Sequence, residues 1–520
     1  MRASSSPSRS SSSSYQTPFL PEEATMSSIP EAQAHESPPI PTLDLPVHLH
    51  MEDKAQKVPY SSFYSRSRPV LTLIIFLFVV VVVSLGTRHT TPSVSSPGVK
   101  LSVSPLPTSS LEEDNIFCTA GRMYVYDLPP QFNADLLMEC SSLVPWTDLC
   151  PALDNNGIGK ALDLPSWMGM GFWYYTSQFG GEVMYHARML EHPCRTLDPE
   201  KATAFFVPFY AGLDVARYLF VPSTTTQRDK LTHSLLDWLS STDTWKRNGG
   251  KDHFFMIGRI TWDFRRGESS LWDRLWRRSG WGSDFFLTPQ MRNPLRLIIE
   301  KSIFDEQEIA VPYPTSFHPT SDSHLAQWQA IVRSSKRDLL FSYAGGPRPQ
   351  FPNDFRSLLL EQCKNASSKC RSFDCSEQRC EHPLPAMELF LDSTFCLQPR
   401  GDSFTRRSIF DSLIAGCIPV FFWHRTAYLQ YGWHLPTKTD SYSVYIDRKE
   451  VRAGKSIEKI LNGFSERRIL KMRETLITAI PRFVYKVPGN SSANFRDAFD
   501  IAIDGVLRLI QEKIRKPNLP

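Results

Sequence analysis

Two apolar stretches flank a loop and a helix rich in charged and hydroxyl groups in FCLQPRGDSFTRRSIFDSLIAGCIPVFF (395–422). The pattern predicts a strand over Phe395–Gln398, a tight loop over Pro399–Asp402, a helix that begins at Ser403, and a second strand from Cys417. Ser403 is a suitable N-cap because its hydroxyl can accept a hydrogen bond from a free backbone N–H of the first turn. The segment therefore presents N–H groups at the end of a strand, where phosphates bind in many α/β proteins.

Arg406 and Arg407 fall in or beside the first turn of this predicted helix. The helix dipole is already positive there, so each cation costs about 0.3–1 kcal/mol. The arrangement is tolerable if an anion lies between the cations, and a nucleotide diphosphate would fit. The alternative is that both arginines are solvated surface charges. The tripeptide Arg400-Gly401-Asp402 also matches a cell-adhesion sequence, but tripeptides recur by chance.

A second glycine-containing loop follows the expected strand that ends in FSYAGGPR. Its glycines permit close approach of a ligand to the backbone, and its arginine can reach a phosphate. Ligands of open α/β sheets lie at the carboxyl ends of the strands, so both loops are expected to contribute to one site. Asp411, two turns into the helix, can accept hydrogen bonds from ribose hydroxyls; a solvent-facing carboxylate is the alternative. The candidate nucleotide-binding residues are Gly345, Gly346, Arg348, Gly401, Asp402, Ser403, Arg406, Arg407 and Asp411.

The elements that must position these residues begin at about residue 115, where apolar strand patterns start to alternate with amphipathic helix patterns. This alternation is typical of α/β folds. It restarts near residue 333 with a basic helix end, a strand and a glycine loop. We therefore predict two doubly wound domains, 115–330 and 331–515. The tail over Arg467–Ile514 is expected to be helical and to cross back onto the first domain.

The N-terminal part differs in composition. Residues 1–69 are rich in Ser, Pro, Glu and Ala and are expected to be a disordered tail. Val70–Leu85 contains no charged residue, and we assign 70–86 as a transmembrane signal anchor; a buried strand or core helix and a cleaved signal peptide are the alternatives. Residues 87–114 form the expected stem. The tail is expected in the cytosol and the rest in the lumen, because more cations precede the span than follow it (Lys54, Lys57, Arg66 and Arg68 against Arg88 and Lys100).

All ten cysteines follow the predicted span, and an even number of cysteines in an oxidising lumen predicts disulfide bonds. Asn365 and Asn490 begin two glycosylation sequons. The formal net charge of +4 gives no indication of nucleic-acid binding. The alternative for one cysteine cluster is a zinc site, at a spacing unlike common zinc modules, made by Cys363, Cys370, Cys375, Cys380 and His382.

The sequence resembles exostosin-like glycosyltransferases, and more closely their plant branch of xyloglucan galactosyltransferases, over roughly residues 115–515. The resemblance is carried by MYVYDLPPQFN, GGEVMYHARMLEHPCRTLDPEKATAFFVPFYAGLD, KDHFFMIGRITWDFRR, KRDLLFSYAGGPRP and CLQPRGDSFTRRSIFDSLIAGCIPVFF. It implies a GT-B fold, with two Rossmann-like domains facing a cleft, a UDP-sugar bound mainly by the second domain, and inversion of the anomeric centre. One departure is that the family tends to have an Arg three residues before the helix acid, where this chain has Ser408 after Arg407.

The resemblance also implies transfer of galactose from its UDP donor to xyloglucan side chains. It implies a single-pass type II protein of the Golgi membrane, with other Golgi glycosyltransferases as candidate partners. UDP-galacturonic acid and UDP-arabinose are the alternative donors, and an inactive lectin-like or scaffold protein is the alternative class. A glycosidase needs a carboxylate pair facing one cleft, which would leave the arginines unexplained. A sulfotransferase needs a phosphate loop near the first strand, and none is recognisable there.

Sugar transfer from UDP requires the departing diphosphate to be stabilised by a metal or by fixed protein charge. The sequence contains no Asp-x-Asp triplet, so we expect no metal and no other cofactor, with the arginines holding the charge. The base that takes the acceptor proton is expected in the first domain. Glu182, Asp263 and His186 are the candidates in that order, and a cap or a core hydrogen bond is the alternative role of each.

Four aromatic residues lie close together in SWMGMGFWYYTSQFGGE (166–182). Aromatic rings can stack on the rings of acceptor sugars, and they can equally fill a core. The four residues are Trp167, Phe172, Trp173 and Tyr174.

Overall fold

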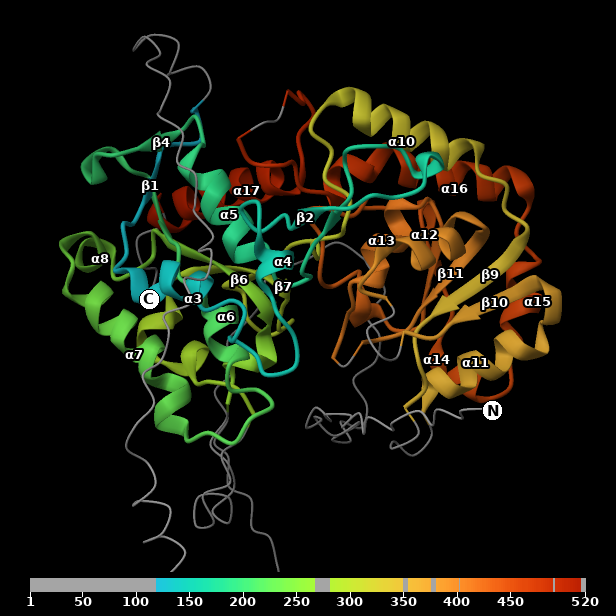
Figure 1. The fold of residues 1–520 in the computed structure, drawn as a ribbon, viewed down its shortest axis with the longest axis horizontal. Coiled ribbons are helices and arrows are strands. Elements are labelled where there is room, and N and C mark those ends of the chain that lie inside the picture. Colours follow the sequence, from blue (N-terminus) through green and yellow to red (C-terminus); the bar gives the residue numbers. More distant parts are fainter. Residues whose placement is uncertain are drawn as a thin grey trace, which may run out of the picture. The chain divides into compact units, whose positions relative to one another are not determined.

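The computed structural model describes residues 118–266, 281–348, 354–375, 380–401, 403–489 and 492–515. All of these residues fall in one compact unit, organised by two parallel sheets (Figure 1). The predicted tail, membrane anchor and stem lie outside the described residues. Within the described part, no helix combines the length and the apolar character needed to cross a membrane.

The first sheet has six parallel strands in the order β4-β1-β5-β6-β7-β8. Numbered along the chain, this order is 2-1-3-4-5-6, which is a doubly wound arrangement. Strands covered on both faces are apolar throughout, and all four residues of AFFV in β5 are buried. The strands are β1 (Met123–Val125), β4 (Arg195–Thr196), β5 (Ala204–Val207), β6 (His253–Ile260), β7 (Leu295–Glu300) and β8 (Glu308–Ala310).

The second sheet has five parallel strands in the order β10-β9-β11-β12-β13. Numbered within this half, the order is 2-1-3-4-5, and the order reverses between β9 and β11. In such sheets, ligands bind at the carboxyl ends of the two strands that flank the reversal. The strands are β9 (Leu339–Ala344), β10 (Cys370–Phe373), β11 (Ser393–Gln398), β12 (Ile418–Phe421) and β13 (Val444–Tyr445).

Helices connect the strands of both sheets, as parallel pairing requires. Around the first sheet they are α3 (Ala134–Met138), α4 (Cys150–Leu153), α5 (Gly181–Leu190), α6 (Ala211–Ala216), α7 (Thr225–Ser241) and α8 (Asp243–Asn248). Around the second they are α10 (Asp322–Ser334), α11 (Phe355–Asn365), α12 (Pro383–Leu391), α13 (Ser408–Ile414), α14 (Arg448–Arg452), α15 (Ile457–Leu461) and α16 (Glu466–Ala479). A short antiparallel pair is formed by β2 (Lys160–Ala161) and β3 (Tyr174–Tyr175).

The C-terminal helix α17 (Ala498–Arg515) returns to the first half of the chain, as the sequence predicted. Gln511 donates to the carbonyl oxygen of Ala120 at 3.0 Å, and Lys513 donates to that of Asn293 at 3.2 Å. The expected domain boundary at residue 330 falls inside α10 rather than in a linker. Because α10 is joined to α16 by the Arg333–Glu474 ion pair, it packs with the second half of the chain.

The helix expected to begin at Ser403 is shorter than predicted. α13 begins at Ser408, the residue at its N-cap is Arg407, and no side chain caps its first turn. Gly401 explains the difference, because a Cβ atom there would lie 2.1 Å from the carbonyl oxygen of Thr405. The chain therefore folds tightly on itself before the helix starts, and the prediction of Ser403 as N-cap was wrong. The two predicted strands are present as β11 and β12.

Five disulfides confirm the prediction from the cysteine count. They are Cys118–Cys194, Cys140–Cys150, Cys363–Cys370, Cys375–Cys380 and Cys396–Cys417. The zinc alternative is wrong, because its four cysteines form two of these bonds. The Cys396–Cys417 bond is fully buried and joins the interior of β11 to the residue that immediately precedes β12.

Candidate functional site

The loops that follow β9 and β11 meet where the strand order of the second sheet reverses (Figure 1). Gly345 allows the two loops to pack closely, because a larger residue would not fit between them. Its φ is +152°, and a Cβ atom there would lie 2.7 Å from the Tyr343 hydroxyl and 3.1 Å from Nη2 of Arg406. Gly346 similarly lies against Asp374, with 2.9 Å between a Cβ and Oδ1. The glycines therefore allow side chains from the loops after β10 and β11 to approach the backbone of the loop after β9.

Arg406 has a buried donor without a hydrogen-bond partner among the described residues. Its Nη2 donates to the carbonyl oxygen of Ala344 at 2.5 Å, and its guanidinium lies 5.8 Å from the centre of the Tyr343 ring. Nη1 of Arg406 and the hydroxyl of Tyr343 are both buried without a hydrogen-bond partner among the described residues. Buried polar groups without partners are costly and commonly mark a ligand site. Two such groups beside Gly345 indicate a site for a hydrogen-bond acceptor.

Further cations surround Arg406. Burial, followed by the neighbouring cations Arg406 and Arg348, lowers the pKa of Arg356 to about 9. Burial and the proximity of Arg400 and Arg406 lower the pKa of Arg348 to about 10, although Asp354 opposes the shift. Both remain charged at neutral pH, so the site concentrates positive charge in a place of low solvent access. Such a site fits a polyanion.

Arg356 was missed by the sequence reasoning, although the signal was present. Asp354 caps α11 by accepting from the backbone N–H groups of Arg356 and Ser357 at 3.0 Å each. Arg356 thus stands in the first turn of a capped helix, which is the same pattern that identified Arg406 and Arg407. Its Nη2 donates to the carbonyl oxygen of Arg400 at 3.2 Å, so it reaches the loop after β11.

Arg407 has a different environment from Arg406. Its Nη1 donates to the carbonyl oxygen of Thr176 at 3.1 Å and its Nη2 to the hydroxyl of Ser316 at 2.9 Å. It also forms an ion pair with Asp411 at 3.5 Å. Burial raises the pKa of Asp411, and Arg407 opposes that shift. Arg407 therefore links the β11–α13 connection of the second sheet to segments of the first half of the chain. Asp411 faces Arg407 rather than solvent.

Glu300, at the end of β7, was also missed. Its carboxylate accepts from the backbone N–H groups of Phe404 at 3.1 Å and Thr405 at 2.9 Å, across the two sheets. Burial raises the pKa of Glu300 to about 7, although the hydroxyl of Ser403 and these N–H groups favour the charged form. The Ser403 hydroxyl therefore hydrogen-bonds to the Glu300 carboxylate instead of capping a helix. Asp402 lies outside the described residues.

Glu182, the first candidate base, lies in the first turn of α5 and is 1% exposed. Its Oε1 accepts from the backbone N–H of Gly212 at 2.7 Å and of Gly258 at 3.0 Å, and Oε2 accepts from Leu213 at 3.4 Å. Burial raises the pKa of Glu182 to about 8, against the effect of these donors and of Arg259. The carboxyl group therefore joins the start of α6 to β6.

The other two candidate bases are also engaged. Asp263 is 3% exposed and accepts from Nε of Arg259 at 2.8 Å and from the indole N–H of Trp281 at 2.6 Å. His186 is buried with Nδ1 2.8 Å from the Tyr210 hydroxyl, and burial lowers its pKa to about 4. The structure brings Glu182 and Asp263 to the two sides of Arg259, while His186 packs among aromatic rings.

The four aromatic residues have separate roles. Phe172 and Trp173 are 0% and 2% exposed, so of the two roles left open by the sequence they fill the core. Tyr174 is half-buried in β3 with its ring in edge contact with His318. Trp167 is 43% exposed. Of the four aromatic residues, only Trp167, in the short 3-10 helix Ser166–Met168, is exposed.

One of the two glycosylation sequons begins within the described residues. Asn365 is the last residue of α11 and is exposed, as a sequon must be, whereas Asn490 lies outside the described residues. Among the residues that the structure describes, no group of three or more His, Cys, Asp and Glu side chains is arranged to hold a metal ion.

Buried carboxyl groups give the protein an unusual pH dependence. Burial raises the pKa of Asp214 from 3.8 to about 6, of Glu300 from 4.5 to about 7 and of Glu182 from 4.5 to about 8. Between the two pKa values of each group, the folded state holds a proton that the unfolded chain releases. The free energy of unfolding therefore falls as pH rises through them.

Four histidines act in the opposite direction. Burial lowers the pKa of each from 6.5 to about 4, so the unfolded chain binds protons that the folded state does not, and stability is lost as pH falls below 6.5. They are His186, His192, His318 and His434.

We expect the highest unfolding temperature near pH 6.5. Below this pH the loss of stability caused by the four histidines outweighs the gain from the three carboxyls. Above it the loss of stability caused by the carboxyls dominates. Thermal unfolding of the full-length protein between pH 5 and 8 measures this. The Glu182→Gln variant should show a smaller decline between pH 6.5 and 8. A wild-type unfolding temperature that rises through that interval would contradict the assignment.

Comparison with known proteins agrees with the geometry. The model of the exostosin GT47 domain matches residues 118–461. The chain is 48% identical over 402 residues to xyloglucan galactosyltransferase XLT2 of Arabidopsis thaliana, covering 76% of each chain. It is 41% identical over 404 residues to xyloglucan-specific galacturonosyltransferase 1 of the same plant, covering 76% of this chain and 58% of the relative.

Solved structures give a weaker likeness. The crystal structure of the pneumococcal O-GlcNAc transferase GtfA in complex with UDP and GlcNAc matches 54% of this chain and 60% of that chain, at 8% identity and a TM-score of 0.27. A likeness of this size carries no argument about fold or ligand. The family match and the relatives are decisive: the chain belongs to the exostosin GT47 family of glycosyltransferases.

Proposed function

We propose that the protein is an inverting glycosyltransferase that moves galactose from UDP-galactose to the side chains of xyloglucan. The observation that carries the proposal is the cationic site at the strand-order reversal, where Nη1 of Arg406 and the Tyr343 hydroxyl have no partner among the described residues. A diphosphate supplies the acceptor oxygens and the negative charge that this site lacks. The relative named xyloglucan galactosyltransferase supports the choice of sugar and acceptor.

The proposed reaction uses this charge on the leaving group. The bond between the anomeric carbon and the β-phosphate oxygen breaks, and UDP keeps the electron pair. The acceptor hydroxyl oxygen bonds to the anomeric carbon from the opposite face, and its proton passes to a protein base. Arg406, with Arg348 and Arg356 beside it, stabilises the charge that develops on the diphosphate. Fixed arginine charge supports a transfer that needs no metal ion.

For the base we keep Glu182 first, followed by Asp263 and His186. Because burial raises the pKa of Glu182 to about 8, only the ionised fraction of this carboxyl group can take the acceptor proton near neutral pH, and that fraction is a strong base. Because Glu182 is 1% exposed and accepts three backbone N–H groups, an acceptor hydroxyl has to displace one of them. Proton transfer by Glu182 therefore depends on movement of the segments around Gly212 or Gly258.

The proposed architecture is GT-B, with the two sheets belonging to two Rossmann-like domains and the donor held mainly by the second. Two doubly wound parallel sheets support it. The proposed location is the Golgi membrane, with a type II anchor over residues 70–86 and the catalytic part in the lumen. Five disulfides support an oxidising compartment.

A second candidate donor is UDP-galacturonic acid. The relative named xyloglucan-specific galacturonosyltransferase covers the same share of this chain, and an arginine-rich site can also hold the carboxylate of a uronic acid. Nothing in the described residues favours UDP-arabinose.

The test is transfer by the purified full-length protein with UDP-galactose, UDP-galacturonic acid and UDP-arabinose, each offered with xyloglucan oligosaccharides. We expect galactose transfer with release of UDP, and we expect the activity to persist in excess EDTA. Transfer only from UDP-galacturonic acid would select the second donor. Absence of both UDP binding and transfer would leave the lectin-like or scaffold class. Strict dependence on Mn²⁺ would contradict the metal-free reaction.

A further inference from the structure

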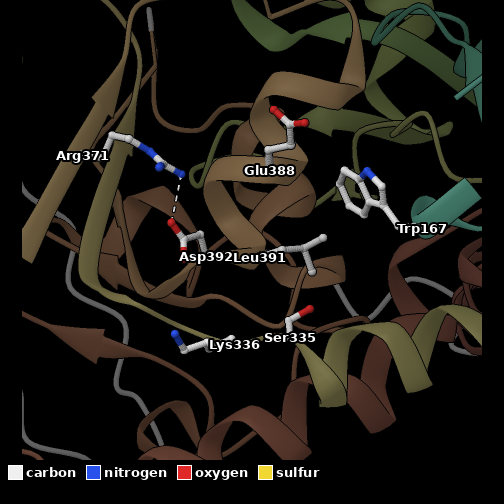
Figure 2. Close-up of a pocket in the computed structure, with 7 residues that line it drawn as sticks. All are labelled: Trp167, Ser335, Lys336, Arg371, Glu388, Leu391 and Asp392. Atoms are coloured by element: carbon white, nitrogen blue, oxygen red, sulfur yellow. Dashed lines mark ion pairs between the residues drawn. The ribbon is translucent and has the colours of Figure 1, made fainter. Parts of the chain in front are cut away.

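A pocket of about 410 Å³ lies at the opposite end of the second sheet from the cationic site, and Trp167 forms one of its walls (Figure 2). Asp392 in this pocket immediately precedes β11, whereas the loop of the cationic site follows the last residue of that strand. A strand rises about 3.3 Å per residue, so the two sites are separated by on the order of 20 Å. The pocket is therefore not part of the proposed donor site.

The indole of Trp167 projects from a well-packed segment and is partly exposed. It is 43% exposed, and in the part of the chain that the structure describes its ring makes no hydrogen bond and no aromatic or cation contact. Its neighbour Met168 is fully buried, and the carbonyl oxygen of Met168 accepts from the indole N–H of Trp173 at 2.9 Å. Gly169, at φ +80°, lies against Phe172 with only 2.1 Å between a Cβ and that ring. The core thus fixes the loop that presents Trp167.

The rest of the pocket contains positively and negatively charged side chains that can form hydrogen bonds. Figure 2 shows the Arg371–Asp392 ion pair, at 3.1 Å, across the pocket from Trp167. Glu388 on α12 is exposed above the floor made by Leu391, and Lys336 lies at the rim. Two cations and two carboxylates leave the pocket without net formal charge. It therefore has no preference for an anion, and it combines an aromatic face with many donors and acceptors.

We propose that this pocket is an accessory site for a neutral sugar residue of the acceptor polysaccharide, distant from the transfer centre. The C–H face of a sugar ring packs on the indole of Trp167, and its hydroxyls hydrogen-bond to Glu388, Asp392 and Arg371. A long acceptor chain that occupies this pocket is held near the enzyme between transfers. The inference rests on the proposed function for the choice of polysaccharide.

The direct test is affinity electrophoresis of the full-length protein in native gels that contain xyloglucan. We expect Trp167→Ala to lose retardation relative to wild type, Trp167→Phe to keep part of it, and Trp146→Ala to keep all of it. Trp146 is the matched control, because it is 37% exposed but packs on Phe220 elsewhere. Equal retardation of Trp167→Ala and wild type would overturn the proposal. Glu388→Ala, an exposed helix position, tests the pocket independently if the tryptophan variant folds poorly.

Kinetics separates this site from the transfer centre. Trp167→Ala should raise the KM for polymeric xyloglucan on the order of 5–10-fold, the loss expected for one aromatic contact. The kcat and the KM for an oligosaccharide too short to span about 20 Å should not change. An equal rise of KM for both acceptors would place Trp167 in the transfer site and overturn the proposal. Gel retardation that depends on Trp167, without any transfer, would sustain the carbohydrate site and refute the proposed function.

Discussion

Arg406→Ala is expected to weaken UDP binding on the order of 10–100-fold and to lower kcat/KM for transfer by about 10²–10³. Its Nη1 is a buried donor without a partner among the described residues, and its charge acts on both Arg348 and Arg356. Loss of Arg406 removes its repulsion of these neighbouring cations. The thermal unfolding temperature without ligand should therefore change little or rise.

Calorimetry with UDP and thermal unfolding measure the two effects separately. Arg508→Ala is the matched control, because Arg508 is exposed on α17, and it should change neither quantity. Normal UDP affinity in Arg406→Ala would refute the proposed donor site. Arg406→Lys keeps the charge without the forked geometry and should recover only part of the affinity.

The neighbouring substitution should behave differently. Arg407 is a candidate nucleotide-binding residue from the sequence, and that role alone would make Arg407→Ala weaken UDP binding without loss of stability. The contacts of Arg407 with Thr176, Ser316 and Asp411 favour another result. Its removal leaves Asp411 without its cation and should lower the free energy of unfolding by about 2–4 kcal/mol. Arg406→Ala should therefore affect UDP binding, whereas Arg407→Ala should affect the stability of the contact between the two halves of the chain.

Glu182→Ala is expected to cause the largest loss of stability. The substitution removes the acceptor for the buried N–H groups of Gly212 and Gly258, with that of Leu213 at a longer distance. Each unsatisfied buried donor costs about 1–3 kcal/mol, so two or three cost about 2–9 kcal/mol, a large part of the usual stability of a domain. Chemical denaturation at pH 6.5 measures the loss. Glu361→Ala, at an exposed position of α11, is the control and should have no such effect.

Glu182→Gln tests catalysis without this disruption, because the amide oxygen can still accept from Gly212 and Gly258. If Glu182 is the base, transfer should fall by at least about 10² while UDP affinity and the unfolding temperature stay near the wild-type values. A Gln variant that retains both stability and transfer would remove Glu182 from the reaction. Asp263→Asn would then be the next variant to measure.

The sequence alone was sufficient for the features that depend on near neighbours. Apolar runs between glycine loops predicted β9, β11 and β12, and the alternation of strands and helices predicted two doubly wound halves. The even cysteine count predicted disulfides. The glycine pair after β9 and the arginines after β11 were recognised because a cation near a helix start is unfavourable without an anion. The glycine and arginine signals act within a few residues, whereas the strand–helix alternation and the cysteine count are properties of composition and pattern that need no knowledge of which residues meet.

Only the tertiary structure decided which of these residues share one environment. Arg406 and Arg407 are adjacent in sequence, yet one faces Tyr343 and the other reaches Thr176 and Ser316. Glu300 is about a hundred residues from the loop that it holds. No local pattern encodes such contacts, because they depend on how the two sheets pack. Packing also buried Glu182 and exposed Trp167, since burial is fixed by the competition of all apolar groups for the same core.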